Sequence, residues 1–195
     1  MATPKSQRIG IWIIAIVLML GTLGSFLVMG LSLNNQRNDT AQGSSDSAAS
    51  LAEYQAQQKI AAQASADNSE PLSGYETRAF DPANVTKLKV EVLSEGSGEV
   101  IKTTDSLKVS YFGWTSDGKI FDSSKKKDTK DAPSTFALSN VITGWKEGLT
   151  GVKAGSVVRL TIPSDKAYGT TGSGIIPADT PLEFIVVIDS IEAAA

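Results

Sequence analysis

The sequence of 195 residues contains no cysteine and no histidine. Disulfides, thiolate nucleophiles and cysteine or histidine metal ligands are therefore excluded, and so are Ser-His and Cys-His catalytic pairs. An excess of positive charge is also lacking, because 18 Lys and Arg stand against 21 Asp and Glu. This balance argues against a strongly basic nucleic-acid-binding protein. We expect no metal ion, no cofactor and no nucleic-acid partner.

Charged residues are missing from Ile9 to Gln36. The apolar part, Ile9–Leu33, exceeds the about 20 residues that a helix needs to cross a hydrocarbon core of ~30 Å. A signal peptide has a shorter apolar core of about 7–15 residues and a cleavage site close behind it. We therefore predict a transmembrane anchor over residues 9–33. The alternative is a signal peptide whose cleavage leaves a secreted domain.

Basic residues flank this segment unequally. Lys5 and Arg8 precede it, whereas Arg37 follows it together with Asp39 and Asp46. The positive-inside rule places the more basic flank in the cytoplasm. We expect residues 1–8 to be cytoplasmic and the rest of the chain to lie outside a cell membrane that it crosses once.

Residues 34–83 form a polar stretch rich in Ala, Ser, Gln and Asp, a composition typical of a linker. Good helix formers dominate residues 48–66, which predicts a helix there. Tyr54 is the one aromatic residue of that helix, and the helix has too few apolar residues to form a packed core. We interpret 34–83 as a low-complexity linker that holds the next domain away from the membrane. A contact helix for a partner protein is the alternative.

Residues 84–195 show the period-two alternation of short strands around 88–92, 107–111, 157–162 and 182–188. Asp117-Gly118 predicts a hairpin turn, and Val141–Leu149 is the one segment suited to a helix, a short one. The prediction is an α+β domain with an antiparallel sheet, large enough to bury a core without metals or disulfides. The expected core residues are Leu88, Val90, Val109, Leu149, Val158, Leu160 and Val186.

Four blocks of less common residues recur along this domain. They are Tyr111-Phe112-Gly113 with residues 117–124, Val141–Leu149, residues 162–169 ending in Ala167-Tyr168-Gly169, and residues 174–184 with Ile176-Pro177 and Leu182-Glu183-Phe184. In this order and spacing they resemble the FKBP-type peptidyl-prolyl cis-trans isomerases, over about Val85 to Ile191. The resemblance implies a twisted antiparallel sheet wrapped around one short helix, with a shallow apolar pocket between them.

The resemblance also implies roles for individual residues. Trp145 would be the pocket floor, and Asp122 the polar group beside the pocket. The hydroxyl of Tyr168 and the backbone N–H of Ile142 would donate to substrate carbonyls, and Asp122, Tyr168 and Trp145 would be catalytic. The residues expected to bind the substrate are Tyr111, Phe121, Val141, Ile142, Ile176 and Phe184.

Isomerisation of X-Pro bonds suits a chain without histidine or cysteine. The barrier to rotation is ~18–20 kcal/mol, because the amide C–N bond has partial double-bond character. A twisted amide is less polar than a planar one, so an apolar pocket favours it without any nucleophile or metal. We expect an isomerase acting on proline-containing polypeptides that are exported or at the cell surface, and a pocket that also takes rapamycin-type macrocycles. The alternative is a membrane-tethered binding or chaperone module that needs no turnover.

Several features depart from the family pattern, and two of them concern Asp122 and the pocket wall. Lys127 stands where many members have Arg, which predicts a weaker bond to Asp122 or none. Ser134 or Thr135 falls where an aromatic wall residue is common. The basic run Lys125–Lys130 is interpreted as a solvated loop, the alternative being a contact with acidic groups of a cell wall or lipid.

Overall fold

The structure is a computed structural model, and it describes residues 43–192. The predicted anchor, residues 9–33, and the predicted cytoplasmic segment, residues 1–8, lie outside the described residues. Within residues 43–192, none of the helices combines the length and the apolar character that crossing a membrane requires.

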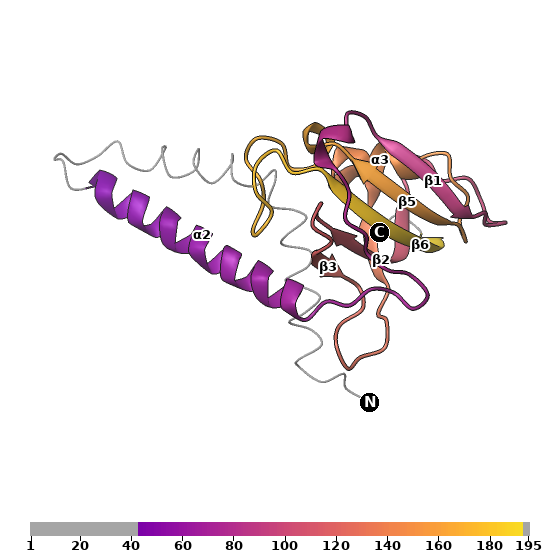
Figure 1. Ribbon diagram of the computed structural model, residues 1–195, viewed down its shortest axis with the longest axis horizontal. Coiled ribbons are helices and arrows are strands. Elements are labelled where there is room, and N and C mark those ends of the chain that lie inside the picture. Colours follow the sequence, from indigo (N-terminus) through magenta and orange to yellow (C-terminus); the bar gives the residue numbers. More distant parts are fainter. Residues whose placement is uncertain (1–42, 193–195) are drawn as a thin grey trace.

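The centre of the fold is an antiparallel six-stranded sheet (Figure 1). Its strands are β1 (Lys89–Ser94), β2 (Ser106–Trp114), β3 (Ile120–Ser123), β4 (Ser134–Ala137), β5 (Val157–Ile162) and β6 (Leu182–Glu192). The order is β1-β5-β6-β2-β3, and β4 pairs with the first half of β2 while β3 pairs with its second half. There are three 3-10 turns outside the strands: Pro82–Asn84 before β1, Leu138–Asn140 between β4 and α3, and Ser164–Lys166 between β5 and β6.

One face of the sheet carries the main core. The helix α3 (Thr143–Leu149) lies over this face and buries Trp145 and Leu149 against it. Gly144 makes the approach close, because a Cβ at that position would overlap the side chain of Ile162 in β5. Alternation explains the strand contribution, since β5 buries every second residue, Val158, Leu160 and Ile162.

The opposite face of the sheet is covered by an extended strap, residues 68–81. Leu72 is buried there with Phe112, Trp114 and Ile185. The Trp114 indole N–H donates to the Arg78 carbonyl over 2.9 Å. The Arg78 guanidinium in turn donates to both carboxylate oxygens of Glu183, which is only 2% exposed. Without a partner this carboxylate would be costly to bury.

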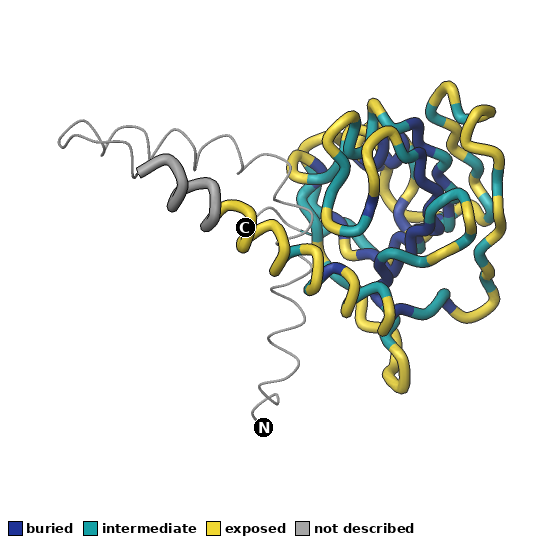
Figure 2. Tube along the Cα trace, turned by 60° about the vertical axis from the view of Figure 1, so that its left-hand side comes forward, coloured by how far each residue is buried: buried dark blue, intermediate teal, exposed yellow. Residues whose placement is uncertain are grey.

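The helix α2 spans Gly43–Asp67 and projects from the sheet domain (Figure 1). The sequence predicts a helix near 48–66 that acts as a spacer. Leu51, Tyr54 and Ile60 are indeed exposed to solvent, but the last turns of the helix are partly buried where they meet β3 (Figure 2). The sequence-based interpretation of α2 as a plain spacer is therefore incomplete.

Most of the predicted elements of the sheet domain are present, including the turn at Gly118, which has φ 81°. The expected burial of Val90 is wrong, because this side chain is 39% exposed. Leu93, not Val90, packs against an apolar cluster from β1. The reason is that β1 lies at the edge of the sheet and pairs with β5 alone, so alternation does not decide which of its faces is covered.

We predict that Arg78→Met destabilises the folded protein by about 1–3 kcal/mol, because the buried Glu183 carboxylate loses its charged partner and keeps one donor, the Thr161 hydroxyl. The free energy of unfolding in urea measures this. The matched control is Lys89→Met, which removes a surface ion pair of 4.0 Å and should change stability by less than about 0.5 kcal/mol. Equal effects of the two changes would contradict the role assigned to the strap.

Candidate functional site

A pocket of about 630 Å³, including its open mouth, lies between α3, β3, β6 and the end of α2. All nine residues that the sequence predicts for the site line this pocket: Tyr111, Phe121, Asp122, Val141, Ile142, Trp145, Tyr168, Ile176 and Phe184. They come from two strands at the sheet centre, one edge strand, one helix and two loops. The fold therefore brings together residues that lie up to 73 positions apart in the sequence.

Trp145 is held by other aromatic rings. Its ring is 4% exposed and meets those of Tyr111 and Phe184 edge to face, with 5.4 Å between ring centroids in each pair. Such pairs contribute about 0.5–1.5 kcal/mol beyond the area they bury. Its indole N–H is buried and has no hydrogen-bond partner within residues 43–192. The indole is thus a rigid apolar surface with one spare donor.

Phe121 and Phe184 stand edge to face at 5.5 Å and form one side of the pocket. The reason for Gly113 in the Tyr-Phe-Gly block is visible here. A Cβ at Gly113 would overlap the ring of Phe184 and would lie 2.6 Å from the ring of Phe121. Glycine at this position lets both rings approach β2 closely.

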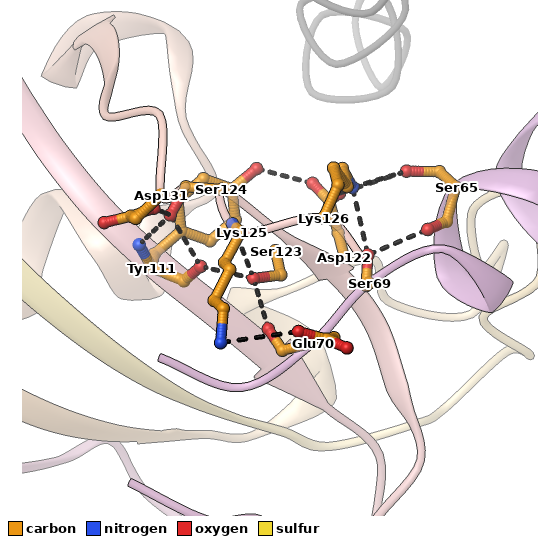
Figure 3. A network of polar contacts seen from close by, with 10 residues as sticks. All are labelled: Ser65, Ser69, Glu70, Tyr111, Asp122, Ser123, Ser124, Lys125, Lys126 and Asp131. Atoms are coloured by element: carbon orange, nitrogen blue, oxygen red, sulfur yellow. Dashed lines mark hydrogen bonds and ion pairs between the residues drawn. The ribbon is translucent and has the colours of Figure 1, made fainter. Parts of the chain in front are cut away.

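Asp122 is the charged group of the pocket and is 8% exposed. Its carboxylate accepts a hydrogen bond of 2.5 Å from the Tyr111 hydroxyl and one of 3.3 Å from the Ser65 hydroxyl. The ammonium of Lys126 donates to it over 3.1 Å (Figure 3). These three donors compensate the cost of removing the carboxylate from water.

Two tyrosines of the pocket stay protonated over a wide pH range. Burial and then the negative charge of Asp122 raise the pKa of Tyr111 well above its usual value of 10. Burial and then Asp122 also raise the pKa of Tyr168. Both hydroxyls are therefore neutral hydrogen-bond donors at physiological pH.

The rim of the pocket comes from two loops. Val141 and Ile142 precede α3, and the Ile142 carbonyl accepts the N–H groups of Trp145 and Lys146 in its first turn. Ile176 is buried in a turn closed by two backbone hydrogen bonds with Ser173, of 2.8 and 2.9 Å. An apolar cup with a paired carboxylate at its edge can bind a compact apolar ring next to a polar amide.

The basic run differs from the sequence-based expectation. Lys127 is exposed, whereas its neighbour Lys126 forms an ion pair with Asp122. The sequence-based expectation considered Lys127 as the partner of Asp122, but the partner is Lys126. Lys125 is paired too, with Glu70 at 3.3 Å. The solvated-loop interpretation holds for Lys127 and Lys130 but not for these two residues.

Phe136 supplies the aromatic ring that Ser134 and Thr135 do not. It packs edge to face against Tyr111 at 5.7 Å and Trp145 at 6.0 Å, behind the pocket rather than in its lining. The alternation of β4 could have indicated this, since Phe136 and Ser134 lie on the same face of the strand.

Four lining residues were not predicted for the site: Ala62, Ser65, Ser173 and Ile175. Ser173 and Ile175 lie in the loop beside the predicted Ile176, so their proximity could have been inferred. Ala62 and Ser65 lie in α2, where nothing in the sequence pattern distinguishes them from other small residues.

Comparison with known proteins places this geometry in a family. Residues 98–189 match the family described as FKBP-type peptidyl-prolyl cis-trans isomerase. The FKBP-type isomerase FkpA of Escherichia coli strain K12 is 35% identical over 153 residues, which cover 74% of this chain and 56% of that protein. The aligned part of this chain is longer than the segment that follows α2. The alignment therefore includes part of α2.

Two further relatives agree. FkpA of Aeromonas hydrophila is 42% identical, covering 55% of this chain and 39% of that protein. The peptidyl-prolyl cis-trans isomerase Mip of Coxiella burnetii is 36% identical, covering 60% of this chain and 54% of that protein. The chain thus spans about half the length of the curated relatives it matches, or less. Residues 98–189, which contain the short helix and most of the residues that line the pocket, therefore form a domain of the FKBP-type peptidyl-prolyl cis-trans isomerase family.

Proposed function

We propose that this protein is a peptidyl-prolyl cis-trans isomerase that accelerates rotation about X-Pro bonds in the aromatic pocket. The observation that carries the proposal is the pocket itself, an apolar cup with Trp145 in its lining and the paired carboxylate of Asp122 at its edge. The match of residues 98–189 to the FKBP-type family supports it.

The mechanism follows from the polarity of the amide. Resonance puts negative charge on the carbonyl oxygen and positive charge on the nitrogen of a planar amide, and water stabilises that form. Rotation removes the resonance, so the twisted amide is less polar. It therefore loses less hydration free energy than the planar amide when it leaves water for an apolar site. Only interactions that are stronger in the twisted state than in the planar one accelerate the reaction.

The residues divide this work between them. Trp145, Phe121 and Phe184 hold the proline ring and exclude water. The Ile142 N–H and the Tyr168 hydroxyl donate to substrate carbonyls and fix the chain on either side of the ring. Asp122 keeps the Tyr111 hydroxyl in place at the wall and offers negative potential to the imide nitrogen as rotation turns it pyramidal.

We further propose that the substrates are exported or cell-surface polypeptides, because the apolar segment 9–33 and its basic flank would place residues 84–195 outside the cytoplasm. Rapamycin-type macrocycles would occupy the same pocket as competitors, since they present a compact apolar ring next to carbonyl groups.

We predict that Asp122→Val lowers kcat/KM for an X-Pro peptide by about tenfold or more, since a loss of 1.36 kcal/mol in the transition state is tenfold in rate. Exchange spectroscopy on the full chain with a short proline peptide measures the rate. The matched control is Asp189→Val, an exposed aspartate of β6 outside the pocket lining, which should leave kcat/KM unchanged.

The same experiment separates the isomerase from a binding or chaperone module. A folded protein that binds the peptide in the pocket but exchanges its proline no faster than buffer would favour the binding module. Acceleration that survives Asp122→Val without loss would contradict the role given to Asp122.

We predict that kcat/KM changes by less than about twofold between about pH 6 and about pH 9. The chain has no histidine or cysteine to titrate in this range. The pKa values of Tyr111 and Tyr168 are raised, so both hydroxyls keep their protons as the pH rises through 9. A bell-shaped profile in this range would show that a titrating group acts in the reaction.

We predict that the full chain stays in the membrane fraction after an alkaline wash. We also predict that protease added to spheroplasts from the outside digests residues 84–195. A cytoplasmic marker protein should remain intact as the control. Release of the domain into the medium would instead support the cleaved signal peptide. Protection of the domain from protease would contradict the orientation inferred from Lys5 and Arg8.

A further inference from the structure

The last turns of α2 reach the pocket, although α2 lies outside residues 98–189, which match the family. Ala62 and Ser65 of this helix are among the lining residues. Ala62 is 6% exposed and Ser65 is partly buried. They lie three positions apart and therefore on the same side of the helix. Ser65 is the polar one of the two, so its hydroxyl is the group through which α2 can act on the chemistry of the pocket.

The carboxylate of Asp122 is held at both of its oxygens, and the donors come from different parts of the chain. One oxygen accepts the hydrogen bond from the Tyr111 hydroxyl on β2. The other accepts the Ser65 hydroxyl of α2 over 3.3 Å and the Lys126 ammonium over 3.1 Å (Figure 3). The last torsion of an aspartate side chain is soft, so a carboxylate held at one oxygen alone can turn. The donors on the second oxygen therefore fix its orientation.

The direction of the hydrogen bonds in this network follows from the groups that form it. The Lys126 ammonium donates to the Ser65 hydroxyl over 3.0 Å, to the Ser69 hydroxyl over 2.9 Å and to Asp122, which uses all three of its N–H groups. The Ser69 hydroxyl donates its own proton to the Ser65 carbonyl over 2.8 Å. Since an ammonium cannot accept and a carboxylate cannot donate, the proton of the Ser65 hydroxyl points at Asp122.

Lysine alone holds a carboxylate less firmly than this network does. Its ammonium is a point charge on a flexible four-carbon stem, without the two parallel N–H groups through which arginine orients a carboxylate. The hydroxyls of Ser65 and Ser69 hold the Lys126 ammonium in place, and Ser65 adds a second donor to the same oxygen of Asp122. Lys126 thus supplies the charge, and α2 supplies the orientation.

Backbone pairing after α2 keeps Ser65 in this position. Ser69, one helical turn beyond Ser65, forms an antiparallel bridge with Lys126. In this bridge the N–H groups of Glu70 and Lys127 donate to carbonyls of the facing segment over 3.1 and 2.9 Å. The pairing sets the register between the end of α2 and the loop after β3. The contact with Asp122 is therefore built into the fold at the level of the backbone.

We propose that Ser65 is a positioning residue of the isomerase site, through which α2 orients the Asp122 carboxylate toward the X-Pro bond. This rests on the proposed function, in which Asp122 offers negative potential to the imide nitrogen as rotation turns it pyramidal. A carboxylate that is free to turn is less often aligned with that nitrogen, so the loss falls on the twisted state. Binding of the planar peptide depends on the aromatic rings and does not change.

The first test separates rate from binding in the full chain with a short proline peptide. Ser65→Ala should lower kcat, measured by exchange spectroscopy, about fivefold, the scale of one hydrogen bond, and should leave the dissociation constant from NMR titration within about twofold. The matched control is Gln63→Ala, a change at an exposed position of the same helix turn, which should alter neither quantity.

A double-mutant cycle tests whether Ser65 acts through Asp122. In the Asp122→Val background the hydroxyl has no carboxylate to orient, so adding Ser65→Ala should leave the residual rate within about twofold. A purely structural role of Ser65 would lower the rate by the same factor in both backgrounds.

An isosteric pair of variants keeps the test independent of helix packing. Ser65→Thr retains the hydroxyl, whereas Ser65→Val replaces it with a methyl group in a side chain of the same shape. The Thr variant should be about fivefold faster than the Val variant. Hydrogen exchange of the Glu70 and Lys127 amides, which form the bridge, verifies that α2 stays docked in every variant.

The outcomes distinguish this inference from the proposed function. No acceleration by the unmodified chain would overturn both. Equal rates of Ser65→Thr and Ser65→Val, or an effect of Ser65→Ala that is the same with and without the Asp122 carboxylate, would overturn the role of Ser65 alone and leave the isomerase intact.

Discussion

The arrangement of this protein depends on satisfying one buried carboxylate. Asp122 cannot lose water without hydrogen-bond donors, and its donors come from three parts of the chain: Tyr111 on β2, Lys126 after β3 and Ser65 on α2. Meeting that requirement fixes the Tyr111 ring in the pocket wall. It also draws the last turns of α2 onto the sheet domain. A single electrostatic constraint thereby connects the wall, the loop and the helix around the same opening.

Core and site share residues in this fold. Tyr111, Trp145 and Phe184 belong to the main apolar core and also line the pocket. Each ring is held by edge-to-face contacts with its neighbours, so the cup is rigid before any peptide arrives. Because the pocket is preorganised, little binding free energy is needed to order the protein. More of it is then available to stabilise the twisted amide. The second apolar cluster, under the strap, is separate and stabilises the sheet from its far side.

The sheet could be predicted because strand alternation is a local signal. The site residues were predicted because four blocks of the sequence resemble the FKBP-type family, and the nine residues that this resemblance implies all line one pocket. The prediction was weaker where no local rule applies. Val90 was assigned to the core although an edge strand leaves it exposed, and Phe136 was overlooked although it supports Trp145. The anchor over residues 9–33 stays a prediction, since it lies outside the described residues.

By itself the sequence determined the four longer strands, the short helix and the hairpin at Gly118, because propensity, alternation and turn residues act over a few neighbouring residues. The set of aromatic residues that belong together came from the resemblance to the FKBP-type family. Only the tertiary structure decided that Lys126 rather than Lys127 pairs with Asp122, and that α2 supplies a wall of the pocket. Ser65 and Asp122 are 57 positions apart in the chain. Contacts at that separation depend on how the whole chain packs, and no short-range pattern encodes which of several similar lysines or serines will meet.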